Sequence, residues 1–525
     1  MSDNFSEKKM SWWIIGLLIF MHITGLSVTI MEPDGALYAG IAKYMVQHHD
    51  YLNLFADGQD WLDKPHFPFW MMAFSYQIFG INTFAYKLPA FLFLMMGVYF
   101  TYRFAFDLYG DKVARWSVCI LLTAEHLVIS STDVRAEPYL TGLIIGAVYF
   151  LYKRRLFLGA LFTACAVMTK GPFALVPVGC AIAGQYIFTK QWKELFHYRW
   201  LIVGVLVLVF IMPELYALYR QFDAHPEKVV FGRTGVSGIR FFFWDSQFGR
   251  FMNTGPIKGS GDPSFFFHTV LWAFLPWSVM LYAAVIQFIR KRKVAVEFYC
   301  ISGALSTFLL FSLSKFQLPH YLNIIFPFFA ILTAQYILTL NKPRFFIITQ
   351  QVIMSVMAVA IVGLWALYRP QINYVFVGLM AGVVLLFFVV KVEKVFYRVC
   401  LMSVLLNLFL NGLFYPDVLG YQSGSSAAFY ANEHLRGGAV CMYRENSYAF
   451  NFYLDAPVLR SDTLMQPPVL LYTTREAVDS LEVGGHVCEV LMSFPRFPVT
   501  KLDGEFVNFS TRKGAVGERL LVLVK

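Results

Sequence analysis

The ionisable residues whose spacing most strongly suggests chemistry lie between residues 31 and 70, directly after the first apolar run of the chain. This segment places Glu32, Asp34, Asp63, Lys64 and His66 among tryptophan and phenylalanine rings. A carboxylate near the hydrocarbon boundary is costly, about 2.5–3.5 kcal/mol at the membrane centre and less towards the ends, so acids in such places predict a use. The structural alternative for Asp34 is that it serves only as a helix N-cap.

Further charged residues recur at the ends of later apolar runs. Asp133 and Arg135 lie in the segment STDVRAEP. The cations beside aromatic residues, glycine or proline are Lys64, Lys170, Arg250 and Lys315. Several cations next to apolar surface suit an anionic lipid headgroup. The alternative for each lysine alone is a side chain that extends to the lipid phosphates of the membrane.

A metal site and a soluble-enzyme site are the two further possibilities for this segment. Asp63 and His66 are candidate ligands of a divalent metal such as Zn or Mg, and a structural histidine is the alternative because two ligands are too few to define a site. The sequence contains no P-loop, GxGxxG, HExxH or GxSxG stretch. No motif of a soluble enzyme therefore offers an alternative to the charged residues named above.

The composition indicates what kind of element carries these residues. The chain has 525 residues, of which 58% are hydrophobic and 14% charged, far from the roughly 25% charged residues of a soluble domain. The net charge of +10 comes from short Lys and Arg clusters between apolar runs, which is typical of membrane topology, so no nucleic-acid partner is expected. We predict a polytopic membrane protein surrounded by membrane lipids.

Apolar runs predict about 13 transmembrane helices, each needing roughly 20 residues. They lie near 12–30, 88–108, 113–131, 138–152, 156–169, 172–188, 200–219, 264–289, 297–313, 318–340, 345–368, 372–390 and 396–415. With a cytoplasmic N-terminus, the basic clusters of alternate loops all fall inside. The opposite side then holds the first long loop (31–87), the later loop (220–263) and the C-terminus.

The chain changes character after residue 418. It loses its long apolar runs and predicts helices at 427–435 and 475–481 with strands at 439–443, 469–473, 487–493 and 520–524. We therefore divide the chain into an all-α membrane domain (1–418) and a small extracytoplasmic α/β domain (419–525). Cys441 and Cys488 in this second domain form either a disulfide or two free thiols.

Taken in order, these segments are similar to a known family. EPDGALYAGIAKYM, DKPHFPFW, STDVRAEP, TKGP and SKFQLPHYLNIIFP resemble the GT-C integral-membrane glycosyltransferases, and within them the aminoarabinose lipid A transferase and protein O-mannosyltransferase-like group. The resemblance covers roughly residues 10 to 340. It implies a polyprenyl-phosphate sugar donor, such as an undecaprenyl phosphate sugar, and transfer on the periplasmic face of a bacterial inner membrane.

The resemblance also implies roles for individual residues. Asp34 matches the catalytic acid of the first loop and Asp133 the second acidic position. Lys64 matches a phosphate-contacting lysine, Asp63 a neighbouring acid that helps to bind metal, and Tyr321 a tyrosine over the lipid-phosphate cavity. The lipid A transferases have an arginine shortly after the first-loop acid, where this chain has Leu37.

These observations predict a glycosyltransferase that acts with inversion. Asp34 and Asp133 are the catalytic candidates, and Glu32, Arg135 and Lys170 are further site candidates. The candidate donor-phosphate ligands are Lys64, Arg250, Lys315 and Tyr321. The acceptor is a lipid, lipid A-like, or a protein or glycan. The alternatives are a membrane transporter or lipid flippase and a non-catalytic assembly factor.

Overall fold

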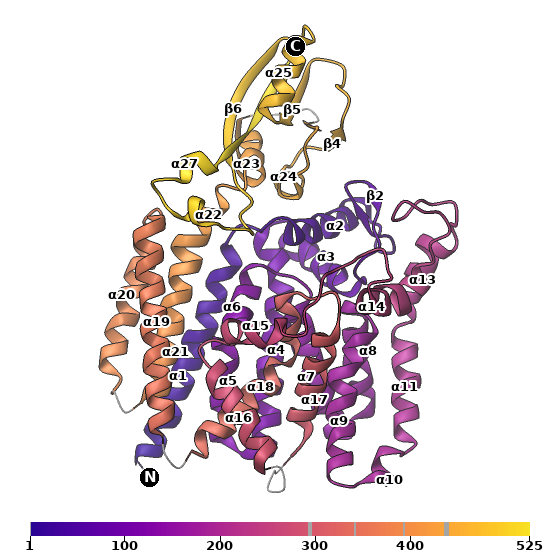
Figure 1. The fold of residues 1–525 in the computed structure, drawn as a ribbon. Helices are drawn as coiled ribbons and strands as arrows, with labels where there is room; N and C mark the ends of the chain where they lie inside the picture. Colours follow the sequence, from indigo (N-terminus) through magenta and orange to yellow (C-terminus); the bar gives the residue numbers. More distant parts are fainter. Residues whose placement is uncertain (1, 292–296, 341–342, 392–393, 435–439) are drawn as a thin grey trace.

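The computed structural model describes residues 2–291, 297–340, 343–391, 394–434 and 440–525. The chain is mostly helical, as predicted: upright helices form a bundle, and a small region with a β-sheet stands on one end of it (Figure 1). The N-terminus and α10 (Trp192–Leu195) lie at the opposite end of the bundle. Arg292, Lys293 and Lys342, which belong to the basic clusters that the sequence predicts on the cytoplasmic side, lie outside the described residues.

Fewer helices qualify as membrane spans than the thirteen predicted. In the described part of the chain, five helices are long and apolar enough to cross a membrane, or up to seven if each of two bent helix pairs forms one span. Five further apolar helices have 10–17 residues. The described helices thus include several candidate membrane spans, and the count of thirteen stays a prediction.

The bundle is built from helices whose apolar residues suit lipid and whose backbone groups are paired internally, as a bilayer requires. They are α1 (Ser2–Thr24), α4 (Thr83–Tyr109), α5 (Asp111–Thr123), α6 (Glu125–Thr132), α7 (Glu137–Tyr152), α8 (Leu156–Lys170), α9 (Leu175–Phe188), α11 (Arg199–Phe210), α12 (Met212–Leu218), α15 (Phe265–Ala273), α16 (Ser278–Lys291), α17 (Tyr299–Leu313), α18 (Phe326–Leu338), α19 (Arg344–Tyr368), α20 (Tyr374–Val389), α21 (Val395–Phe409) and α22 (Tyr415–Leu419). The α5–α6 pair bends by 55° and the α11–α12 pair by 41°. Such breaks let polar residues enter the bundle.

The first long loop is structured. It contains α2 (Asp34–His48), a hairpin of β1 (Phe55–Ala56) and β2 (Gln59–Asp60), and α3 (Phe67–Phe79). These elements lie at the end of the bundle that carries the C-terminal region (Figure 1). The later loop adds α13 (Gly238–Arg240) and α14 (Arg250–Met252), and a 3-10 helix over Pro319–Ile325 precedes α18.

The C-terminal region forms one five-stranded sheet with strand order β4-β3-β5-β7-β6. Its elements are α23 (Gly424–His434), β3 (Val440–Tyr443), α24 (Tyr448–Tyr453), β4 (Val458–Ser461), β5 (Val469–Thr473), α25 (Arg475–Val483), β6 (Cys488–Arg496), α26 (Gly504–Val507), α27 (Arg512–Ala515) and β7 (Gly517–Val524). β3 pairs in parallel with β4 and β5, whereas β7 is antiparallel to both of its neighbours. The prediction missed β4, α24, α26 and α27, and residues 435 and 439 of the predicted elements lie outside the described residues.

The two cysteines of this region are free thiols. Cys441 is on β3 and Cys488 is on β6, and two strands lie between them. With neighbouring strands about 4.8 Å apart, the separation is roughly 14 Å, which exceeds the reach of a disulfide. Of the two alternatives left open by the sequence, the structure supports free thiols.

Buried charges attach the C-terminal region to the first loop. Glu32 accepts hydrogen bonds from Ser447 Oγ at 2.6 Å and from the Ala449 backbone N–H at 2.7 Å, and Arg496 lies 3.5 Å away. Lys43 of α2 is buried and donates to three backbone carbonyls at the end of α24, at 2.8–2.9 Å. These bonds leave little freedom for α2 to move against α24.

Candidate functional site

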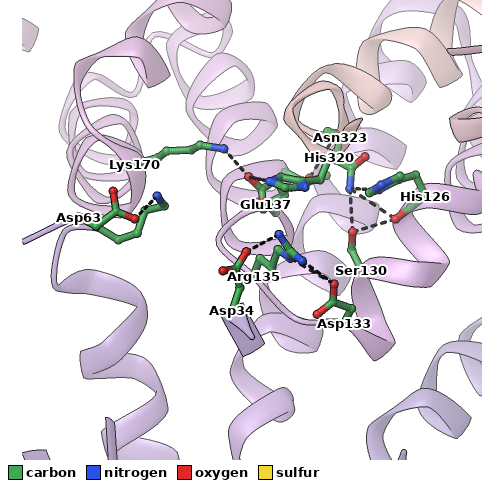
Figure 2. A network of polar contacts seen from close by, with 12 residues as sticks. Asp34, Asp63, His126, Ser130, Asp133, Arg135, Glu137, Lys170, His320 and Asn323 are labelled. Atoms are coloured by element: carbon green, nitrogen blue, oxygen red, sulfur yellow. Dashed lines mark hydrogen bonds and ion pairs between the residues drawn. The ribbon is translucent and has the colours of Figure 1, made fainter. Parts of the chain in front are cut away.

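Asp34 is the first residue of α2 and lies beside an arginine that comes from a distant part of the chain. Arg135 Nη1 donates to Asp34 Oδ2 at 2.6 Å. The same guanidinium contacts Asp133 Oδ2 at 3.1 Å, so it bridges the two acids (Figure 2). The Asp34 side chain is 39% exposed and the Asp133 side chain 15%, so Asp34 is the carboxylate that a substrate can reach.

The local sequence explains this arrangement. The segment between α6 and α7 holds both Asp133 and Arg135, and α7 begins with Glu137 and Pro138. Proline at the first turn of a helix costs no hydrogen bond and fixes where the helix begins. This chain has Leu37 at the position where the resemblance predicts an arginine. Arg135 instead places an arginine next to Asp34.

A second acid lies between two cations. Asp63 Oδ2 is 2.7 Å from Lys64 Nζ, and Asp63 Oδ1 accepts from Arg250 of α14. Burial by itself raises the pKa of Asp63, but the charges of Lys64 and Arg250 outweigh it and lower this pKa to about 2. Asp63 is therefore a carboxylate at neutral pH, and it holds both cations in place.

A third ion pair lies between these two. Glu137 accepts a hydrogen bond from Lys170 Nζ, and His320 Nε2 is 3.7 Å from Glu137 (Figure 2). Lys170 Nζ also lies 3.7 Å from the centre of the Tyr321 ring. The Glu137 side chain is only 3% exposed, so it fixes the position of Lys170 from behind.

These groups line a polar cavity of about 520 Å³. Asp34, Tyr38, Arg135, Glu137, His320, Asp63, Lys64, Lys170, Arg250 and Tyr321 are among its lining residues. We call this space the polar cavity. It gathers acids and cations from the first loop, the α6–α7 connection, α8, α14 and the 3-10 helix before α18.

A larger space of about 930 Å³ adjoins it, here called the apolar cavity. Its lining is rich in apolar side chains, including Leu62, Leu140, Phe173, Leu218, Phe241, Phe242, Phe251, Phe311 and Ile324. The two cavities share Asp63, Lys64, Lys170, Arg250, Phe316 and Tyr321. We call these six shared residues the wall. Its three cations, Lys64, Lys170 and Arg250, lie between the apolar cavity and the polar cavity.

Three of the predicted site residues lie elsewhere. Glu32 is bound to the C-terminal region, as described above. Lys315 is exposed and lines neither cavity. Asp133 does not line the polar cavity and contacts Arg135 from behind.

The candidate metal pair does not converge on one point. The His66 ring is buried, with Nδ1 3.0 Å from Glu214 Oε1 and Nε2 3.0 Å from the Leu52 carbonyl oxygen. Both oxygens of Asp63 are bound to cations. Among the described residues, no group of three or more His, Cys, Asp or Glu side chains could hold a metal ion. Asp63 and His66 therefore do not fit a shared metal, and no chemistry is assigned to one.

Sequence reasoning did not assign Glu137, His320 and Tyr38 to the site. Glu137 was visible in the STDVRAEP segment that contains Asp133 and Arg135. Its role depends on contact with Lys170, 33 residues further along the chain. Tyr38 lies one helical turn after Asp34, a spacing that places both on one face of α2.

Comparisons with known proteins agree with this architecture. Residues 63–216 match the family described as dolichyl-phosphate-mannose-protein mannosyltransferase. An undecaprenyl phosphate-alpha-4-amino-4-deoxy-L-arabinose arabinosyl transferase of Pseudomonas fluorescens is 27% identical over 329 residues, which cover 59% of this chain and 55% of that protein. The enzyme of the same name from Pseudomonas aeruginosa is 27% identical over 334 residues, covering 60% and 57%. The chain thus spans less than two thirds of the length of these curated relatives.

The crystal structure of ArnT from Cupriavidus metallidurans bound to undecaprenyl phosphate superimposes with a TM-score of 0.74, at 17% identity and with 97% of each chain covered. The apo form of that protein gives a TM-score of 0.73 over the same coverage. Together with the family match and the curated relatives, this likeness shows that the chain has the GT-C glycosyltransferase fold and is related to the aminoarabinose transferases.

Proposed function

We propose that the protein transfers a sugar from a polyprenyl-phosphate donor to an acceptor, with inversion. The observation that carries this proposal is the wall shared by the two cavities, where Lys64, Lys170 and Arg250 lie between an apolar space and a polar one. A lipid-linked sugar has the same order of parts: an apolar tail, an anionic phosphate and a polar sugar. The donor therefore fits across the wall without any nucleotide-binding motif.

In this proposal the phosphate of the donor binds the cations of the wall. Their charge stabilises the lipid phosphate as it leaves the sugar, and such fixed charges typically contribute about 10²–10³ in rate. Glu137 and Asp63 keep the cations in place before the donor arrives. Tyr321 lies against Lys170 and forms part of both cavities.

Asp34 serves as the proton acceptor. It is the exposed carboxylate of the polar cavity, and Arg135 orients it while Asp133 holds Arg135. The acceptor hydroxyl gives its proton to Asp34, its oxygen bonds to the anomeric carbon, and the bond from that carbon to the phosphate oxygen breaks. The phosphate leaves as an anion, so no second carboxylate is needed as a general acid, unlike glycoside hydrolysis. Attack opposite the leaving group gives inversion.

The sugar and acceptor follow from the relatives. Aminoarabinose and lipid A-like lipid are the first donor sugar and acceptor to test, because the curated relatives are named as aminoarabinosyl transferases of undecaprenyl phosphate. A mannosyl donor with a protein or glycan acceptor is the second pair, in line with the matched family. A transporter or flippase is not favoured. The charges of such a protein should line a path through the bundle, whereas the charges here gather around the polar cavity.

We place the reaction on the periplasmic face of a bacterial inner membrane. The helices α2 and α14, which contribute to the polar cavity, lie towards the end of the bundle opposite the N-terminus (Figure 1), and the basic clusters of the sequence predict a cytoplasmic N-terminus. Residues 1–418 then form the catalytic membrane domain, and residues 419–525 a periplasmic domain above it.

The test uses purified full-length protein in lipid nanodiscs. Undecaprenyl-phosphate aminoarabinose is offered with lipid A, and undecaprenyl-phosphate mannose with a protein acceptor, and the products are weighed by mass spectrometry. We expect the mass of one sugar to appear on one acceptor and to vanish in Asp34→Asn. Absence of transfer from both donors, with undecaprenyl phosphate still bound, would reject these assignments.

A further inference from the structure

The largest of the described cavities lies outside the site above. It holds about 1540 Å³ between α2 and the β1–β2 hairpin on one side and α24 and β4 of the C-terminal region on the other. We call it the outer cleft. This volume includes the open mouth of the cleft, so a ligand can enter it from solvent.

Aromatic rings and amide groups line the outer cleft together. Tyr44 lies 5.0 Å from Phe55 and 4.0 Å from His48, measured between ring centres, and Tyr448 lies on the side of the C-terminal region. Gln47 extends from the exposed face of α2. Ring faces bind the C–H faces of sugars, and planar polar side chains bind their hydroxyl groups.

The charges of the outer cleft balance. Lys43 and Arg460 are its described basic residues apart from His48, and Asp57 and Asp455 are its acids. Lys43 is bound to three carbonyls, and Arg460 lies 3.9 Å from Asp57. The cleft therefore has as many acids as Lys and Arg residues, whereas the residues shared by the polar and apolar cavities include three cations and one acid, Asp63.

We infer that the outer cleft binds a neutral oligosaccharide. Its aromatic rings, its amide side chains and its balanced charge all match a chain of uncharged sugars. α2 connects this cleft to the proposed reaction, because Asp34 begins the helix whose next turns carry Leu37, Gly40 and Tyr44 into the cleft. The saccharide is then the glycan part of the acceptor, an assignment that rests on the proposed function.

Binding is tested without any transfer reaction. Full-length protein in nanodiscs is applied to an array of neutral, sialylated and sulfated oligosaccharides of three to eight sugars. We expect a neutral oligosaccharide to be retained, and the affinity for it to fall by about tenfold or more in Tyr44→Ala, as expected for one lost contact of about 1.4 kcal/mol. Asp34→Asn should bind like the wild type, so a failed transfer assay leaves this test intact.

Two further variants keep the test independent of folding. Tyr430 stacks on His434 in the same i,i+4 geometry as Tyr44 on His48, but outside the cleft, so Tyr430→Ala is the matched control and should bind normally. A Cβ at Gly40 meets nothing within 4 Å, so Gly40→Leu should fold and block the cleft. The inference would be overturned if the protein retained only charged glycans or no glycan at all. Wild-type affinity in both Tyr44→Ala and Gly40→Leu would overturn it too.

Discussion

The polar cavity and the outer cleft share one helix but differ in charge. α2 gives Asp34 and Tyr38 to the polar cavity and Leu37, Gly40 and Tyr44 to the outer cleft, from different faces of the helix. The wall of the polar cavity gathers three cations, whereas the charges of the outer cleft cancel. The difference shows where an anionic leaving group can be stabilised and where a neutral ligand fits better.

The largest expected effect concerns the acid of the polar cavity. Asp34→Asn removes the proposed proton acceptor and should lower the rate of sugar transfer by about 10²–10⁴, measured as single-turnover product formation by mass spectrometry. Binding of undecaprenyl phosphate should stay unchanged, since the wall cations remain. If the variant kept the wild-type rate, Asp34 would have no part in the mechanism. The polar cavity and the outer cleft would then no longer differ in their role in the reaction.

The cations of the wall come next. Arg250→Ala should lower kcat/KM for the donor by about 10²–10³, the typical loss for one group that stabilises developing negative charge. Lys315→Ala is the matched control, because Lys315 is exposed and lines neither cavity. If both variants had the same effect, the position of the charge would not matter and the wall would not be the phosphate site.

Glu137 should act through Lys170 rather than on the substrate. Glu137→Gln removes the partner of a lysine that is mostly buried, so donor KM should rise by about tenfold, and the melting temperature should fall because breaking a buried pair costs about 3–5 kcal/mol. The conservative variant Glu137→Asp should recover part of the donor affinity. A loss of stability with unchanged KM would make Glu137 purely structural.

The smallest effect is on acid stability. The pKa of Asp63 is about 2 in the folded chain and close to 3.9 when unfolded, so its ion pairs stabilise the fold fully above about pH 4, and this contribution is lost as the pH falls towards 2. It amounts to on the order of 2 kcal/mol. Melting temperatures of wild type and Asp63→Asn should differ at pH 6 and converge near pH 2. A constant difference would contradict the lowered pKa.

Local pattern predicted much of the fold. β5 has the predicted bounds 469–473, because its sequence VLLYT is a mostly buried run of strand-forming residues, whereas β4 was missed because Val458–Ser461 is a short edge strand with an exposed arginine. In the site, Asp34, Lys64, Lys170 and Arg250 were named from the sequence and lie around the polar cavity.

The remaining differences depend on contacts between distant segments. Glu32 and Asp34 are two positions apart and look alike in the sequence, but Glu32 meets Ser447 and Arg496, more than 400 residues away. Lys315, like Lys170, is a lysine at the end of an apolar run. It is exposed only because of the path that the chain takes after α17. No periodicity or local motif encodes such contacts.

The close succession of Glu32 and Asp34 has a mechanical consequence. The first is held by the C-terminal region and the second by Arg135, and only about 7 Å of backbone separates them. A rigid displacement of the C-terminal region must therefore pull on Asp34, the proposed proton acceptor. A partner that binds the C-terminal region can therefore shift the position of Asp34 through Glu32, without touching either cavity.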